Sequence, residues 1–298
     1  MKKAFLQLHI SVFIAGFTGI LGKLISLNEI LLVAWRIAIT LVILGLLLYI
    51  KNMLRLIPAK EMLKIALVGF IICFHWVAFY GSIKYSNVSV ALVCFSATGF
   101  FTALFEPLIL RRRLNYKELL LGLLTISGIY IIFDFYPQYY LGVIFGIAAS
   151  VGSSIFPILN KQLLVKYKPR ELTFYELGGG LLIMILFIPF YLQKFPAGHL
   201  MPTTADWGWL FLMASGGTVL MFELQLHALK KVSAFTVNLT YNLEPVYGIV
   251  LAFIIFKENK NFGSHFYIGL SLILLAIILQ TFIVRNQHKK TATDSLAI

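Results

Sequence analysis

Ten apolar runs, each close to twenty residues long, fill most of this 298-residue chain. An α-helix rises 1.5 Å per residue, so about 20 apolar residues cross the roughly 30 Å hydrocarbon core of a bilayer. The strands of a membrane β-barrel are half as long and alternate in polarity, and these runs do neither. The sequence therefore predicts an all-α polytopic membrane protein with ten transmembrane helices. The runs lie at about residues 4–25, 29–50, 63–83, 88–110, 117–134, 139–162, 171–191, 206–229, 233–256 and 264–284.

The composition excludes most other classes of protein. Hydrophobic residues make up 60% of the chain and charged residues 12%, whereas a soluble domain carries about 25% charged residues. A water-soluble enzyme, a disordered chain and a coiled coil are therefore excluded. Cys73 and Cys94 both lie inside apolar runs, which predicts apolar packing rather than a disulfide or a metal site. We expect no metal and no cofactor.

The 25 basic residues are distributed unevenly between alternate loops. With the N-terminus in the cytoplasm, 19 of them fall in cytoplasmic segments, 5 in external segments and Arg36 inside a span. Lysine and arginine in short cytoplasmic loops orient membrane proteins, so the net charge of +13 reflects topology and not a nucleic-acid partner. We predict an integral plasma (inner) membrane protein with both termini in the cytoplasm.

The two halves of the chain resemble each other. The fourth run opens at residues 84–92 and the ninth at 228–236, and in each a short basic turn precedes a serine and an apolar stretch. Gly122 and Gly269 occupy matching positions in the fifth and tenth runs. Five helices per half is an odd number, so the second copy must be inverted, an arrangement typical of secondary transporters. The predicted domains are a first five-helix repeat at 1–135, a second, inverted repeat at 136–286 and a polar cytoplasmic tail at 287–298.

Three segments carry a resemblance to a known family. They are Trp35-Arg36 in the second run, residues 75–89 across the third and fourth runs, and residues 242–245 leading to 256–258. The chain resembles the EamA family of the drug/metabolite transporter superfamily over nearly all of residues 5–285. The resemblance implies ten helices, two inverted five-helix repeats and movement of small organic solutes, since family members include exporters of amino acids and other metabolites. One departure is that the family often has a proline midway along the fourth helix, where this chain has Gly99 or Phe100.

Glu244 is the leading candidate for a functional residue, because an ionisable group in the middle of a span is costly. At about 100° per residue, Asn238, Tyr241 and Asn242 share a broad arc with it, whereas leucines and valines occupy the opposite side. That arc suits a hydrated cavity near the midplane. The alternative is an interhelical hydrogen bond to a glutamic acid that stays protonated. Pro245 removes one backbone hydrogen bond and frees a carbonyl at the same depth.

The third run supplies a second group of candidates. His75 and Trp76 lie near its middle, and Trp76 and Tyr80 can form aromatic walls, although packing alone is an alternative for each. Ser96 in the fourth run is a candidate hydrogen-bond donor, and Glu223 in the eighth run is either a site residue or a gate. The predicted substrate-binding residues are His75, Trp76, Tyr80, Ser96, Glu223, Asn238, Tyr241, Asn242 and Glu244.

Three other charged side chains inside the runs are interpreted as structural. Arg36 and Glu176 lie about one and a half turns inside their helices at roughly matched repeat positions, from which they can reach loop charges. Glu106 lies one turn from the three arginines at 111–113 and is expected to form a local ion pair.

Together these features predict a secondary transporter, an exporter by resemblance, of small organic solutes such as amino acids or related metabolites, working by alternating access. A proton is the candidate coupling ion, because desolvation disfavours a charged Glu244 and protonation removes that charge. Facilitated diffusion through a channel-like uniporter stays open as the alternative mechanism. An intramembrane enzyme is the rival class, but the chain has no HExxH, GxSxG or P-loop motif and we expect no enzyme. The solute and the lipid bilayer are expected partners, and both a monomer and a homodimer are open.

Overall fold

The computed structural model describes residues 2–54, 57–232, 234–241 and 243–294. All regular structure in these ranges is helical, as the apolar runs predict. Short 3₁₀ turns lie at η1 (Pro137–Tyr139) and η3 (Glu258–Asn261), and a π-helical segment at η2 (Ser215–Leu220). The α-helices are α1 (Lys2–Leu24), α2 (Glu29–Ile50), α3 (Ala59–Tyr85), α4 (Val88–Phe95), α5 (Thr98–Leu110), α6 (Tyr116–Phe135), α7 (Tyr140–Leu163), α8 (Pro169–Lys194), α9 (Thr204–Ala214), α10 (Met221–Leu229), α11 (Ala234–Tyr241), α12 (Glu244–Phe256) and α13 (Ser264–Asp294).

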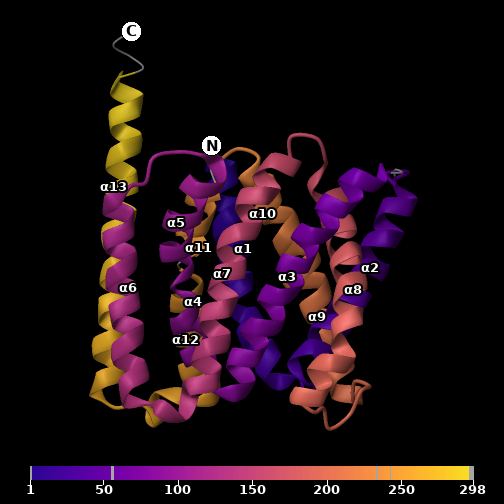
Figure 1. The fold of residues 1–298 in the computed structure, drawn as a ribbon, viewed down its shortest axis with the longest axis horizontal. Helices are drawn as coiled ribbons and strands as arrows, with labels where there is room; N and C mark the ends of the chain where they lie inside the picture. The colour runs from indigo at the N-terminus through magenta and orange to yellow at the C-terminus, as the bar shows by residue number, and fades with distance from the viewer. Residues whose placement is uncertain (1, 55–56, 233, 242, 295–298) are drawn as a thin grey trace.

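The helices run back and forth between the two ends of one bundle (Figure 1). Lys2 and the last turns of α13 lie at one end, here called the terminal end, and the α1–α2 turn lies at the opposite end, here called the far end. Within the described ranges, eight helical segments are long and apolar enough to cross a membrane. Two further apolar helices, Glu244–Phe256 and Ser264–Gln280, are shorter.

Glycines set the closest helix contacts in the bundle. α3 packs against α7 and α8, and α6 and α13 lie side by side at one edge (Figure 1). A Cβ atom on Gly69 of α3 would lie 1.7 Å from the carbonyl oxygen of Glu176 in α8. At the edge pair, a Cβ atom on Gly128 would lie 2.6 Å from the carbonyl oxygen of Gly269. No larger side chain fits at these crossings, so small residues fix the spacing of the helices.

Both cysteines are buried and free, as their place in apolar runs predicts. Cys94 of α4 packs against the start of α7, where a Cβ atom on Gly146 would lie 2.5 Å from the Cys94 Cβ. The Ser150 hydroxyl donates to the Cys94 carbonyl oxygen at 2.9 Å. The thiol therefore acts as a small filler between two closely packed helices.

Three of the predicted spans are helical but contain irregular backbone geometry. The fourth run becomes α4 and α5, which break at Ser96 and Ala97. The eighth run contains η2 between α9 and α10, and the ninth run contains α11, which ends at Tyr241, and α12, which begins at Glu244. Irregular backbone frees polar groups, and inside a membrane these are tolerated only where protein or a water-filled cavity surrounds them.

Local side-chain and backbone signals account for several helix ends. The Asn28 and Asn87 side chains cap α2 and α4 by accepting backbone N–H groups at 3.1 Å and 2.8 Å. The caps after α5 and α12, Arg111 and Lys257, both have left-handed backbone, with φ of 53° and 55°. The second halves of the fourth and ninth runs, α5 and α12, thus end with the same geometry, whereas α10 ends at Lys230 with right-handed backbone.

Candidate functional site

A small cavity lies where α1, α2, α3 and α7 meet the irregular helices. Its volume is about 40 Å³. A buried water needs roughly 10–15 Å³ of such space, so a few waters fit and an organic solute does not. In this conformation the cavity is therefore closed to organic solutes. Its walls are formed by Ala15, Thr18, Arg36, His75, Trp76, Phe79, Tyr80, Phe95, Ser153, Phe156, Met221, Phe222, Gln225, Tyr241 and Glu244.

Arg36 of α2 is the only lysine or arginine among the described residues of this wall and is 1% exposed. Its Nη1 donates to the Tyr80 hydroxyl at 2.6 Å. Its Nε donates to Thr218 Oγ1 and its Nη2 to the Gly217 carbonyl oxygen, both at 2.8 Å. The guanidinium carbon lies 3.9 Å from the centroid of the Trp76 ring, well inside the distance of about 6 Å for a cation–π contact. Arg36 is thus held entirely by neutral groups in the described part of the chain.

Among the described residues, Arg36 and Glu176 do not pair with loop charges as expected, whereas the loop residue Arg112 acts on Glu106 electrostatically without a direct ion pair. Arg36 lies two helical turns from the start of α2, about 10 Å along the axis, and finds nearer partners inside the bundle. Glu176 accepts only from the Asn160 amide, at 3.4 Å. Within the described residues none of the three forms an ion pair, and one oxygen of each glutamate has no hydrogen-bond partner.

The π-helical segment η2 supplies two of the three acceptors for Arg36. The Gly217 carbonyl oxygen and the Thr218 hydroxyl belong to consecutive residues of this segment. The Thr218 hydroxyl also donates to the Met213 carbonyl oxygen at 3.2 Å. Because its proton is used in that bond, the Thr218 oxygen presents a lone pair to Nε of Arg36. π-helical turns are rare and frequently lie at functional sites. The segment therefore positions the guanidinium group.

Glu244 lies in the same cavity wall, at the first residue of α12. It is 5% exposed, and its carboxyl group makes no hydrogen bond to another described residue. The Arg36 guanidinium acts on it electrostatically without a direct ion pair among the described residues. The start of a helix also favours an acidic group. The cavity thus contains a buried cation and a buried acid, each of which remains free to contact a third group.

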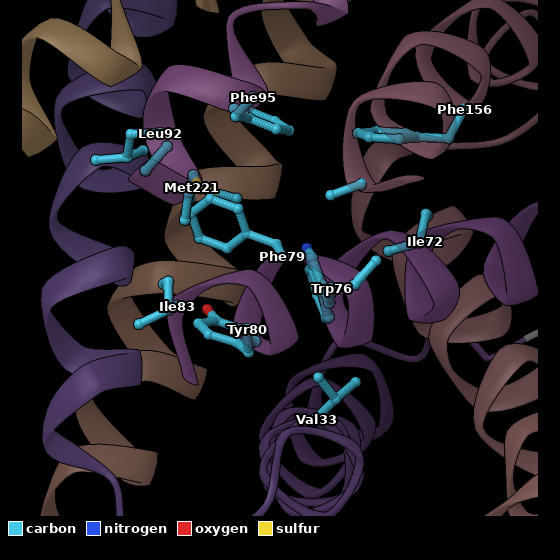
Figure 2. Packing of buried hydrophobic residues seen from close by; sticks show 14 of the residues in the cluster. Val33, Ile72, Trp76, Phe79, Tyr80, Ile83, Leu92, Phe95, Phe156 and Met221 are labelled. Carbon is cyan, nitrogen blue, oxygen red and sulfur yellow. The ribbon is translucent and has the colours of Figure 1, made fainter. Parts of the chain in front are cut away.

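Aromatic rings form most of the remaining wall. The His75 ring stacks on Phe95 and Phe156, with centroid distances of 5.3 Å and 6.1 Å. Its Nδ1 lies 2.9 Å from the Ala149 carbonyl oxygen, and because a carbonyl can only accept, Nδ1 donates. Figure 2 shows Phe95 and Phe156 on separate helices around Trp76. These rings give the cavity an apolar surface beside its charged one.

Two more polar side chains line the cavity. The Tyr241 hydroxyl lies 2.5 Å from the Ser11 hydroxyl, which also donates to the Met221 carbonyl oxygen. Gln225 is 3% exposed, and its Oε1 has no hydrogen-bond partner in the described part of the chain. An unsatisfied buried acceptor is costly, so a donor from a bound molecule would stabilise this site.

The structure brings together some of the predicted site residues and separates others. Ser96 lies at the α4–α5 break, but its hydroxyl donates to the Leu92 carbonyl oxygen at 3.2 Å and does not line the cavity. Asn238 lies on α11, with its side chain outside the described part, and Asn242 lies outside the described residues altogether. The predicted residues that line the cavity are His75, Trp76, Tyr80, Tyr241 and Glu244.

Glu223 lies away from the cavity, at the terminal end of the bundle. Arg170, near the start of α8, donates to its two oxygens, with Nε–Oε2 at 3.1 Å and Nη2–Oε1 at 2.5 Å. The two side chains are 19% and 29% exposed. This bidentate pair joins α8 to α10.

Sequence reasoning missed Arg36, Gln225 and the phenylalanine rings as wall residues. Arg36 carried a usable signal, because it is the only lysine or arginine more than three residues from the end of a predicted span. Gln225 and the phenylalanines gave no signal that distinguishes them from other residues of the same apolar runs.

Buried carboxylates tie helices together at the far end. Glu258, which is 1% exposed, accepts the backbone N–H groups of Val88 and Ser89 at 3.2 Å and 2.9 Å. The Lys23 ammonium at the end of α1 lies 2.6 Å from the same carboxylate. One carboxylate therefore holds together α1, the start of α4 and the turn after α12.

Two further buried carboxylates extend this far-end network. Asp206 of α9 accepts from the backbone and the hydroxyl of Ser26 at 2.7 Å and 2.6 Å. Glu29 accepts from the Tyr191 hydroxyl at 2.5 Å, which joins α2 to the end of α8. Three buried carboxylates therefore connect helices at the far end.

The terminal end is held by more exposed contacts. Beside the Arg170–Glu223 pair, Glu61 of α3 accepts from Lys166 at 2.5 Å and from Tyr167. Burial and the hydrogen bond to Glu61 raise the pKa of Tyr167 to about 12, so its hydroxyl stays a donor at neutral pH. The two ends are thus closed by different sets of polar contacts.

Comparison with known proteins gives the family. The EamA-like transporter family matches residues 2–134 and again residues 140–282. The chain is 26% identical to the uncharacterized transporter YetK of Bacillus subtilis over 298 residues, which cover 95% of this chain and 88% of that protein. It is 24% identical to an uncharacterized transporter of Archaeoglobus fulgidus over 223 residues, 74% of this chain and 76% of that protein.

A solved structure has the same fold. It superimposes on this chain with a TM-score of 0.67 at 13% sequence identity, covering 95% of this chain and 98% of the other. With two family matches that together span most of the sequence, the chain is an integral membrane protein that belongs to the EamA-like transporter family.

Proposed function

We propose that this chain is a secondary transporter that moves a small organic solute past Arg36 and Glu244 by alternating access. The observation that carries the proposal is the closed cavity with a buried cation and a buried acid, between two bundle ends held by different contacts. Ionisable groups at membrane depth are costly and mark solute or ion pathways. Interrupted helices around such a cavity are typical of transporters.

The proposal includes ten spans in two inverted repeats, at residues 1–135 and 136–286, with a polar tail at 287–298. Counting α11–α12 as one interrupted span and α13 as another gives ten. The two family matches support the division into repeats. Lys23 at the end of α1 binds Glu258 at the far end, whereas Lys161 at the end of α7 binds the Val232 carbonyl oxygen at the terminal end, at 2.6 Å. Matched lysines at opposite ends support inversion of the second copy.

The terminal end faces the cytoplasm of an inner membrane in this proposal, because most of the basic loop residues lie there. Export is the proposed direction and amino acids or related metabolites the proposed solutes, both by the family resemblance. A facilitative uniporter is the alternative mechanism. An intramembrane enzyme would need side chains arranged to react with a substrate. The residues of the cavity wall are better suited to binding a solute than to reacting with it.

Alternating access requires that each end opens in turn. Opening the far end separates α1 from the α12 turn and thus breaks the Lys23–Glu258 pair. Opening the terminal end separates α8 from α10 and breaks the Arg170–Glu223 pair. The cavity walls belong to helices from both halves of the chain, so either opening widens the space around Arg36.

The proposal is tested by counterflow in proteoliposomes that contain only this protein. Vesicles are loaded with a bacterial metabolite extract, diluted into isotopically labelled extract, and analysed by mass spectrometry for solutes that exchange. A transporter exchanges a small set of solutes faster than protein-free vesicles do. If no solute exchanges above the protein-free control, the proposed function is wrong.

A further inference from the structure

Arg36 keeps unused hydrogen-bonding capacity inside the cavity. A guanidinium group has five N–H donors. Nε uses its single N–H on Thr218, Nη1 uses one of two on Tyr80, and Nη2 uses one of two on Gly217. One N–H on each terminal nitrogen therefore has no partner among the described residues, although the side chain is 1% exposed.

The charge of Arg36 is also without a direct partner. All three of its acceptors are neutral, and within the described residues it forms no ion pair. A buried cation held only by dipoles is expensive, and an anion in contact with it recovers much of that cost. Glu244, the only acidic residue in the cavity wall, makes no hydrogen bond to it in the described part.

The rigidity of the guanidinium group points to a particular ligand group. Trp76 stacks on its face at 3.9 Å, while Tyr80 and the π-helical segment fix its edges. A carboxylate has two acceptor oxygens and can accept the remaining N–H of each terminal nitrogen in charge-assisted hydrogen bonds. The surrounding rings of Phe95, Phe156 and His75 would then contact an apolar body.

We infer that Arg36 is the anchor for a carboxylate on the transported solute, so that the substrate class is carboxylates with an apolar body. This inference rests on the proposed transport function and narrows it. Glu244 alone suits a cation, but an amine without a carboxylate would meet the unpaired charge of Arg36 and be repelled. The unpaired Gln225 Oε1 offers an acceptor to an ammonium or hydroxyl group on the same solute.

Binding to the purified full chain tests this class directly. Thermal unfolding is followed with matched sets of compounds that share a phenyl, indolyl or isobutyl body. Each set contains the α-amino acid, the simple carboxylic acid, the methyl ester and the decarboxylated amine. We expect the acids to raise the unfolding temperature at concentrations at least tenfold lower than the esters and amines of the same body. Equal effects of ester and acid, tighter binding of amines, or no stabilisation by any carboxylate would each overturn the inference.

Two variants connect the preference to Arg36. Arg36→Lys keeps the charge but not the planar pair of donors, and should weaken acid binding at least tenfold. Thr218→Val leaves the arginine in place, removes its Nε acceptor and should weaken acid binding several-fold. It serves as the test if Arg36→Lys does not fold. Arg113→Lys, at an exposed loop position, is the matched control and should bind as the wild type does. Wild-type acid binding in both Arg36→Lys and Thr218→Val would exclude Arg36 as the anchor.

The counterflow assay separates this inference from the proposed function. Exchange restricted to solutes without a carboxylate would contradict the inference and leave a transporter. Acid binding that depends on Arg36, without exchange of any solute, would support the carboxylate site and contradict transport.

Discussion

The guanidinium carbon of Arg36 lies 3.9 Å from the centroid of the Trp76 ring, and both side chains are buried in the wall of one cavity. The two residues come from α2 and α3, so this contact also joins neighbouring helices. A desolvated cation–π contact contributes about 2 kcal/mol. The stack therefore both stabilises the bundle and fixes the plane of the guanidinium group in the cavity wall.

The effect of replacing Trp76 on transport flux should depend on whether the new side chain is aromatic. Trp76→Phe keeps an aromatic face under Arg36 and should retain a substantial part of the flux. Trp76→Leu removes that face and should lower flux at least tenfold while the protein still folds. Flux per folded protein in proteoliposomes, with unfolding temperature measured in parallel, distinguishes the two. Equal flux for both variants would mean that the ring only fills space.

Gly22 of α1 should be intolerant of any side chain, because a Cβ atom there would lie 2.3 Å from the Tyr80 ring. Gly22→Ala should push Tyr80 away from Arg36 and reduce both unfolding temperature and flux. The matched control is Gly208→Ala in α9, where a Cβ atom meets nothing within 4 Å. That change should be neutral or slightly stabilising, because alanine favours helix more than glycine does. A Gly22→Ala protein with wild-type flux would show that the position of Tyr80 is not critical.

Topology can be checked by cysteine labelling in intact cells. Native Cys73 and Cys94 are buried, so an added cysteine dominates the signal. Arg112→Cys at the terminal end should resist an impermeant thiol reagent until the membrane is permeabilised. Gly198→Cys in the exposed far-end loop should react at once. The reverse pattern would place the termini outside the cell.

The Arg170–Glu223 pair should control opening of the terminal end. Glu223→Gln removes one charge of the bidentate pair and should favour the state open at that end, which changes the flux and exposes the cavity to thiol reagents. The exchanged double variant, Arg170→Glu with Glu223→Arg, should restore the wild-type reactivity of a cysteine introduced at Ser153 in the cavity wall. If Glu223→Gln does not change that reactivity, the pair is a surface contact without a gating role.

Proton coupling through Glu244 is a separate prediction. Glu244→Gln should abolish accumulation driven by a pH gradient and keep exchange of solute, because the glutamine cannot carry a proton. Wild-type transport should also move protons together with solute. Asp134→Asn, at an exposed position in α6, is the control and should behave as the wild type does. Equal net flux of the wild type at every imposed pH gradient would favour facilitated diffusion.

The apolar runs predicted the helices well because hydropathy over about twenty residues reports directly on membrane burial. Neither the break between α4 and α5 nor the one between α11 and α12 was predicted. No proline lies at Ser96 or Ala97 to mark the first break. Pro245 was expected to remove one backbone hydrogen bond of the ninth run, but not to divide the run into two helices. Five of the predicted site residues line the cavity. Polar side chains in the middle of a span are costly to expose to lipid, so they face the interior of the bundle. The partners of Arg36 were not predicted, because two of its three acceptors belong to a π-helical turn for which the sequence gives no recognisable signal.

The central claim is that solute passes through the cavity at Arg36, and the flux of an Arg36 variant tests it most directly. Counterflow of the exchanging solutes is measured for the wild type, Arg36→Gln and the exposed control Arg113→Gln, each reconstituted from material with a single cooperative unfolding transition. We predict that Arg36→Gln loses at least 99% of the exchange per folded protein and that Arg113→Gln keeps it. Wild-type exchange by a folded Arg36→Gln protein would contradict the account.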